Sequence, residues 1–307
     1  MEMEYTKDFS VIIPVWRGAI KYLPKLFDSI PKKKGIEIIV VDNSKEPVNR
    51  DEILSDREIT FLHSAPERHA GGSRNDGMAA AQGKWLLFAD ADDYYAPGAF
   101  EVFYSKYNSD AEMVFTKPTG IYEDTDEHSD RGDGYANLVH GYCVGKVSEE
   151  KLRLGFTTPW CKMVSHALVD REGLRYDEIR AGNDTFFSLA SGYFAKTIEA
   201  VDEVTYIVTV NYGSLTHRRD KEVIKARLYS RLHRNQFLRD HGRGNHQLSV
   251  MGYFHDSFRY GLGTVWACVR MILKFRQNPF VGYKHWHKNI KVKEQNENSD
   301  RKYVAEK

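Results

Sequence analysis

The stretch that decides the fold is residues 71–100, GGSRNDGMAAAQGKWLLFADADDYYAPGAF. Residues 73–82 are mostly small residues that a helix tolerates. The run at 85–90, WLLFAD, is short, apolar and ends in an acid, which predicts a buried strand. Pro97 and Gly98 come soon afterwards and favour a turn.

Three carboxylates follow this strand within four positions, at Asp90, Asp92 and Asp93. Like charges this close raise at least one pKa or require a compensating cation. Mg²⁺ or Mn²⁺ is the natural partner, because hard divalent ions take oxygen ligands and leave positions open for substrate phosphates. The alternative is a solvated turn without a ligand.

The residues before this stretch repeat the pattern of apolar strand and helix. Helical spacing of apolar residues marks 19–30, and buried strands are predicted at 9–15 (FSVIIPV), 36–42 (IEIIVVD) and 59–64 (ITFLHS). This alternation predicts an α/β fold with a parallel sheet, whose ligands bind beyond the carboxyl ends of the strands. Asp42 and Asp90 end two of these strands. Neither a G-x-G-x-x-G turn nor a P-loop is present, so a metal clamp would hold phosphates instead.

Composition describes a globular chain with two regions of opposite charge. The 307 residues suggest one to two domains, and the mean hydropathy of −0.55 excludes a polytopic membrane protein. The three cysteines form no CxxC pair, and the N-terminus has no apolar signal segment, so we expect reduced thiols and a cytoplasmic protein. Residues 1–217 carry a net charge of −11 and residues 218–307 a net charge of +12, which predicts two parts with different roles.

The strings FSVIIPVWRGAIKYLPKLFDSI, IEIIVVDNS, residues 71–100 and TTPWCKM together resemble family-2 glycosyltransferases of the GT-A fold, over about residues 9–215. The resemblance implies a Rossmann-like, mostly parallel sheet flanked by helices in a catalytic domain, 1–217, followed by a helical extension, 218–307. A nucleotide-sugar half would span about 1–100 and an acceptor half about 101–217. Such enzymes move a sugar, with inversion, from a nucleotide diphosphate sugar to an acceptor hydroxyl, typically in surface polysaccharide or glycolipid assembly. We therefore expect a UDP-sugar donor and a carbohydrate or lipid-linked acceptor.

The resemblance also implies roles for individual residues. It places the donor nucleotide against Pro14, Asp42, Asn43, Arg74 and Asp90. It places Mn²⁺ or Mg²⁺ on Asp92, with Asp93 in support and His217 as a further ligand. Asn43 departs from the family, which often has a second acid there, and this leaves the identity of the donor open.

The acceptor half contributes the proposed base. Asp184 matches the catalytic base, while Asn183 replaces the acid that commonly precedes it. Trp160 is either a platform for the acceptor sugar or a core aromatic. Residues 118–145 are expected to form a loop that closes over the acceptor. Two other functions stay open: a metal-dependent nucleotidyltransferase, and a degenerate protein that binds a sugar nucleotide without transferring it.

The basic C-terminal region predicts a surface contact. A helix is expected over 220–239, and residues 257–293 contain eight Lys and Arg, no acid and several aromatic residues, among them Trp266, Phe275, Phe280, Tyr283 and Trp286. The apolar run 261–275 is too short to span a bilayer, but the segment suits the headgroups of an anionic membrane. A helical cap on the catalytic domain is the alternative, and nucleic acid is not expected because no binding module is visible. The protein would then be peripheral on the inner face of the cell membrane.

Overall fold

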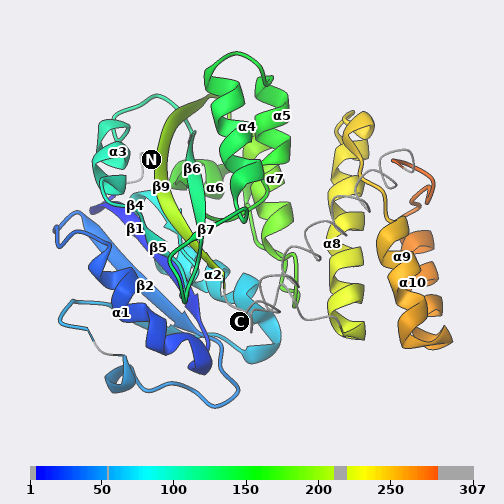
Figure 1. Ribbon diagram of the computed structural model, residues 1–307, viewed down its shortest axis with the longest axis horizontal. Coiled ribbons are helices and arrows are strands. Elements are labelled where there is room, and N and C mark those ends of the chain that lie inside the picture. Colours follow the sequence, from blue (N-terminus) through cyan, green and yellow to red (C-terminus); the bar gives the residue numbers. More distant parts are fainter. Residues whose placement is uncertain (1–4, 54, 211–219, 283–307) are drawn as a thin grey trace. The chain divides into compact units, whose positions relative to one another are not determined.

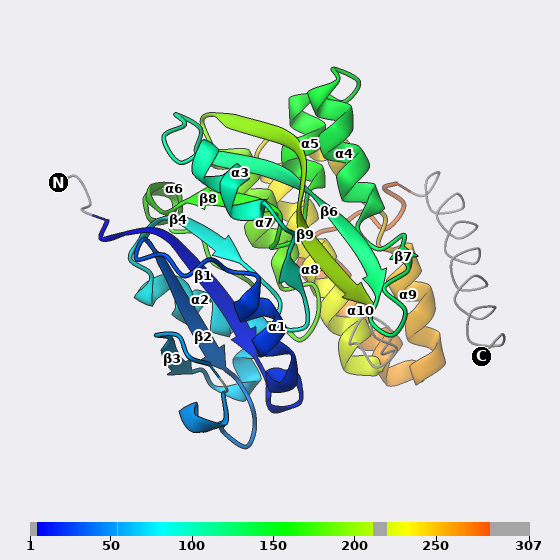
Figure 2. The ribbon, with the colours of Figure 1, turned by 60° about the vertical axis from the view of Figure 1, so that its left-hand side comes forward.

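A computed structural model describes residues 5–53, 55–210 and 220–282 (Figures 1 and 2). Backbone contacts divide the chain into two compact units, Met1–His217 and Arg218–Lys307. The first unit is a mixed α/β fold with a central sheet flanked by helices. The order of strands in this sheet is β3-β2-β1-β4-β8-β6-β9-β5, with β7 paired to β6.

The first half of the sheet is parallel, as the sequence predicts. It consists of β1 (Lys7–Val15), β2 (Ile36–Asp42), β3 (Thr60–His63) and β4 (Gly83–Phe88). In its register Val15 lies opposite Asp42, and Asp42 opposite His63. The carboxyl ends of β1, β2 and β3 therefore meet at one edge. Strand β4 ends at Phe88, so Asp90 stands just beyond the strand and not within it.

The second half of the sheet is mixed. Its strands are β5 (Tyr94–Tyr95), β6 (Met113–Tyr122), β7 (His128–Ser129), β8 (Lys162–Ser165) and β9 (Ile198–Val210). Strand β8 runs antiparallel to both β4 and β6, whereas β6 and β9 are parallel to each other. This arrangement brings β8, which begins at Lys162, next to the strand that leads into the acid triplet.

Helices flank this sheet. They are α1 (Leu23–Asp28), α2 (His69–Ala80), α3 (Ala99–Ser105), α4 (Asp133–Cys143), α5 (Glu149–Gly155), α6 (His166–Glu172) and α7 (Asp184–Phe194). The helix predicted over 19–30 begins as a 3-10 helix, Arg17–Tyr22, because Pro24 favours the first turn of α1 as a new start. The prediction that residues 118–145 form a loop over the acceptor is wrong. The end of β6, the hairpin strand β7 and α4 occupy most of it, since Met113–Tyr122 pairs along its length with β9.

The second unit is helical. Helix α8 (Lys221–Asp240) begins at Asp220, whose carboxylate accepts hydrogen bonds from the backbone N–H groups of Glu222 and Val223, each 2.9 Å long. Helices α9 (Met251–Ser257) and α10 (Leu262–Lys274) pack against α8 and against each other (Figure 1). Their shared core is apolar and consists of Leu228, Leu232, Val250, Cys268 and Ile272.

Two further features are the absence of a membrane-spanning helix from the described residues and the state of the cysteines. No helix in the described part of the chain is long and apolar enough to cross a membrane. All three cysteines, Cys143, Cys161 and Cys268, are unpaired.

Candidate functional site

Asp42, at the end of β2, anchors the loop that follows it. Its side chain is 1% exposed, and one carboxylate oxygen accepts hydrogen bonds from the backbone and hydroxyl of Ser44. The other oxygen accepts a 2.9 Å hydrogen bond from the Val48 N–H and lies 3.3 Å from His63 Nδ1. Because its oxygens are already engaged, Asp42 shapes the loop at the sheet edge. Its contact with a base or ribose stays a prediction.

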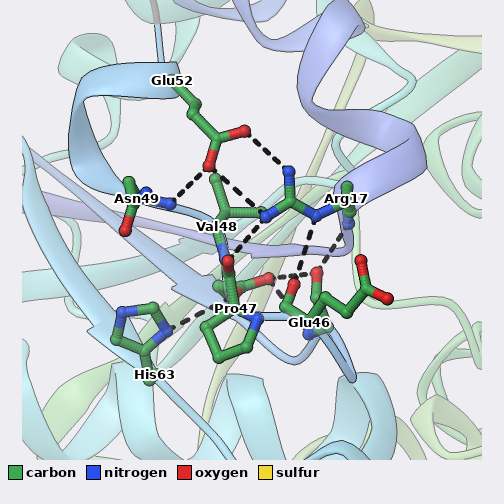
Figure 3. A network of polar contacts seen from close by, with 9 residues as sticks. Arg17, Glu46, Pro47, Val48, Asn49, Glu52 and His63 are labelled. Carbon is green, nitrogen blue, oxygen red and sulfur yellow. Dashed lines mark hydrogen bonds and ion pairs between the residues drawn. The ribbon is translucent and has the colours of Figure 1, made fainter.

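Arg17 fastens the same loop from the other side (Figure 3). Its guanidinium donates to the carbonyl oxygens of Glu46 and Pro47 and forms an ion pair with Glu52, 2.7 Å long. The Arg17 N–H also donates to Ser44 Oγ at 2.7 Å. Asn43 lies where β1 and β2 end, and its N–H donates to the carbonyl of Val15, the residue after the buried Pro14. The chain thus holds a preformed loop, 43–48, over the ends of β1 and β2.

The acid triplet combines burial with mutual repulsion. Burial and the nearby Asp90 raise the pKa of Asp92 to about 6. Burial, with Asp92 and Asp90, also raises the pKa of Asp93 well above its usual range, although Asp93 accepts a 2.7 Å hydrogen bond from the Thr209 N–H. Asp90 is 31% exposed and open to a ligand. A bound cation would relieve this repulsion.

Arg74 joins the two halves of the site. It projects from α2, and its side chain is 5% exposed. Its Nη2 donates to Asp90 Oδ1 at 2.5 Å, and its Nη1 donates to Asn183 Oδ1 at 3.0 Å. Arg74 Nε is buried without a partner, so one donor is left for a ligand or a water. One guanidinium thus brings together residues that lie 16 and 109 positions from it along the chain.

Helix α2 also holds the segment that leads to Asp184. Asn75 donates to the Tyr176 carbonyl and accepts a hydrogen bond from the Tyr176 N–H. Gly71 lies so close that an added Cβ would be 2.0 Å from the Asp177 carbonyl oxygen. Only a residue without a side chain permits this approach.

Asp184 opens α7 beside this network and is half-buried. Burial raises its pKa, Asp90 raises it further, and the cations Arg74 and Lys162 oppose the rise. Within the described residues no side chain donates a hydrogen bond to its carboxylate, so its role as a base stays a prediction. Asn183 accepts from Arg74 and donates to the Ile179 carbonyl, so the amide fills a structural role where the family often has an acid.

Lys162 is a functional candidate that sequence reasoning did not single out. It is 2% exposed, and its Nζ donates to the Phe156 carbonyl at 3.2 Å. Burial lowers its pKa to about 7, against the opposing effect of Asp184. The preceding Cys161 has a left-handed φ of 58°, an uncommon conformation for a non-glycine residue. The sequence shows neither the burial of Lys162 nor the backbone conformation of Cys161, so sequence reasoning had no signal for this residue.

Of the remaining predicted positions, one is packed in the core and the others lie outside the described residues. Trp160 is 6% exposed and stacks on Tyr206 with ring centroids 5.7 Å apart, which agrees with the core alternative. His217 and residues 283–293 lie outside the described residues. Arg131 is a second residue that the sequence did not point to. Burial is the main cause of the raised pKa of Asp92, and the charge of Arg131 partly offsets it.

The fit of a divalent metal depends on what completes its coordination. The described chain contains no cluster of three His, Cys, Asp or Glu side chains able to hold a metal by itself. Asp92, with Asp93 beside it, offers carboxylate oxygens, the ligand type that Mg²⁺ and Mn²⁺ prefer. These residues fit a metal whose remaining ligands come from a diphosphate.

Sequence comparison identifies the family. The model of glycosyl transferase family 2 matches residues 10–172. The chain belongs to this family. The curated relatives of this family-2 glycosyltransferase include the putative glycosyltransferase EpsH of Bacillus subtilis, 24% identical over 202 residues, which cover 63% of this chain and 58% of EpsH. They also include the poly(ribitol-phosphate) β-N-acetylglucosaminyltransferase TarS of Staphylococcus aureus, 23% identical over 210 residues, which cover 64% of this chain and 35% of TarS.

Solved structures agree on the fold of this family-2 glycosyltransferase. The structure of S. aureus TarS 1-349 in complex with UDP-GlcNAc has a TM-score of 0.59 at 18% identity and covers 87% of this chain and 80% of that one. The GT-A-type fold expected from the sequence is thereby confirmed. The matched region spans 58% and 62% of the length of the first two curated relatives.

Proposed function

We propose that this glycosyltransferase inverts the anomeric centre as it moves a sugar from a UDP-sugar to an acceptor hydroxyl, with a divalent metal on the donor diphosphate. One observation supports this above the others: Arg74 bridges Asp90 and Asn183, and so holds the acid triplet beside Asp184. The acid triplet would then hold the donor, and the Asp184 carboxylate would face the same site from the acceptor side, as in-line transfer requires.

The donor would lie over the edge formed by β1, β2 and β4. The loop 43–48, held by Asp42 and Arg17, would contact the nucleotide with its backbone and with Asn43. Asp90 would bind the ribose, and Arg74 would orient Asp90 through their ion pair. Solved TarS structures contain UDP and UDP-GlcNAc, which favours a uridine nucleotide here.

Mn²⁺ or Mg²⁺ would be held by Asp92, with Asp93 in support. Bound there, the metal would stabilise negative charge on the leaving diphosphate as a Lewis acid. The raised pKa values of Asp92 and Asp93, caused first by burial and then by neighbouring acids, fit a site that gains from a cation. His217 remains a proposed further ligand.

Asp184 would remove the proton from the acceptor hydroxyl as the bond to the sugar forms. A positioned general base contributes about 10²–10⁴-fold to a rate. Its pKa, raised by burial, makes the carboxylate a stronger base than an exposed one. The acceptor would be a carbohydrate or a lipid-linked glycan of surface polysaccharide assembly, in line with the poly(ribitol-phosphate) named for the relative TarS. The protein would act in the cytoplasm, peripheral to the inner membrane face.

The donor proposal is tested by thermal unfolding with UDP-, GDP-, CDP- and dTDP-sugars, each with and without Mn²⁺. A ligand that binds only the folded protein stabilises it by about 2.7 kcal/mol at a hundredfold excess over Kd. We expect a shift with UDP-sugars that grows with Mn²⁺. No shift with any nucleotide sugar would contradict the proposal.

Two substitutions separate the metal site from the base. Asp92→Asn should remove the Mn²⁺-dependent part of the shift. Asp184→Asn should keep the shift but lower turnover by about 10²–10⁴-fold. Asp51→Asn, an exposed acid, is the control and should alter neither. Full turnover by Asp184→Asn would exclude Asp184 as the base.

A further inference from the structure

Helix α10 of the C-terminal unit has two apolar faces. The inner face carries Thr264, Cys268 and Ile272, all buried, and packs against α8 and α9. An ordinary amphipathic helix would turn a polar face outward. In α10 the outward side also carries large apolar residues.

The outward residues form one stripe. Leu262, Trp266 and Leu273 are 82%, 62% and 68% exposed. They are spaced four and seven positions apart, so they lie within a narrow arc of the helix, opposite the buried face. Phe258, directly before α10, is a further 55% exposed. Large apolar side chains gathered on one surface mark an interaction site, whereas scattered ones need no explanation.

From residue 257 to 282 every Asp, Glu, Lys and Arg position is basic. Arg259, Arg270, Lys274 and Arg276 are exposed, and residues 257–282 contain no acid. A protein partner that buried this stripe would need an acidic rim around an apolar centre. An anionic bilayer supplies both at once, since its headgroups are negative and its acyl boundary is apolar.

We propose that the face of α10 formed by Leu262, Trp266 and Leu273, with Arg270 and Lys274 at its side, docks on the surface of an anionic phospholipid bilayer. The helix lies in the interface and does not cross it, since α10 has 13 residues and a span needs about 20. The apolar stripe enters the headgroup region, and the basic residues contact lipid phosphates. This docking goes beyond the transfer reaction and does not depend on it.

The experiment is co-sedimentation of the full chain with phosphatidylcholine vesicles, with and without phosphatidylglycerol. We expect binding that requires phosphatidylglycerol and weakens as salt is raised. The triple variant Leu262→Glu/Trp266→Glu/Leu273→Glu should lose at least about tenfold in binding, because it removes the apolar contact and adds negative charge. Arg270→Gln/Lys274→Gln tests the charges alone and should weaken binding less.

Controls keep the test specific. Val144→Glu, at an apolar residue of the first unit that is 46% exposed, should bind vesicles like the native protein. Circular dichroism of the triple variant should be unchanged, because the three side chains are exposed. Unchanged vesicle binding by the triple variant would overturn the proposal. A second result would also overturn it: the native chain binds no vesicles but self-associates in light scattering, and the triple variant loses this self-association. The face would then join two copies of the chain. Transfer to a soluble acceptor should persist in the triple variant, which separates this proposal from the catalytic one.

Discussion

At the scale of single residues, the feature with the clearest chemical consequence is Lys162. Its buried ammonium is one of two cations that hold down the pKa of Asp184, the other being Arg74. Asp90 acts in the opposite direction. Burial raises the pKa of Tyr135 and of Tyr176, and the nearby Asp184 raises both further. We regard Lys162 as a positioning residue, since it acts through Asp184.

Lys162→Met should move the acidic limb of the pH–kcat/KM profile to higher pH. Removing the cation raises the pKa of Asp184, and a base works only when it is deprotonated. The difference from the native profile should be largest below pH 7 and shrink above it, because Lys162 itself loses its proton near pH 7. The measurement is kcat/KM from pH 5 to 9.

The control for this profile is Lys117→Met, which removes a lysine that pairs with Asp202 on the same sheet. It should leave the limb in place. A Lys162→Met profile that is lower at every pH but not displaced would mean that Lys162 only packs.

Residue-level prediction succeeds where the signal is local. Asp90, Asp92 and Asp93 lie within four positions, so their mutual repulsion can be inferred from the sequence, while a bound cation stays a prediction. The pairing of Arg74 with Asn183 spans 109 positions and depends on how α2 meets the segment before α7. The burial of Lys162 depends in the same way on β8, which has partners on both sides.

At the scale of elements, the loop 43–48 shows how one buried acid can organise a binding surface. Asp42→Ala would leave the N–H groups of Ser44 and Val48 without their acceptor, and each unsatisfied buried donor costs about 1–3 kcal/mol. We expect a lower free energy of unfolding and a raised KM for the donor, with a smaller change in kcat. Denaturant unfolding and donor-dependent kinetics measure both effects.

Asp51→Ala is the matched control for Asp42→Ala, since Asp51 is an exposed acid just beyond the same loop. It should change neither quantity. If Asp42→Ala lowers stability but leaves the donor KM at its native value, the loop takes no part in donor binding.

A strand or helix is predicted correctly from the sequence when its own residues are enough to determine it. Strand β2 matches its expected bounds, 36–42, because a continuous apolar run bounded by polar residues admits few alternatives. The region 118–145 suggests a loop because it is acidic and contains glycines. In the fold its first residues extend β6 along β9, a pairing between strands about 90 positions apart that no local pattern reveals.

At the scale of the whole molecule, the two units carry opposite charge and different chemistry. The sequence already divides at this point, from −11 over 1–217 to +12 over 218–307. The acidic unit contains the acid triplet 90–93, where a cation is proposed to bind, and the basic unit contains the exposed face of α10. If each unit binds its own ligand, the two ligands should act on the chain independently.

Hydrogen exchange can test this independence in the full chain. UDP-sugar with Mn²⁺ should slow exchange at residues 42–48, 90–93 and 183–187, since a ligand suppresses the opening of the region that it binds. Phosphatidylglycerol vesicles should slow exchange at 258–274 and leave those three segments unchanged. Phosphatidylcholine vesicles are the control for the second effect. Protection of 258–274 by the nucleotide sugar alone would mean that α10 belongs to the donor site, and that the two units work as one.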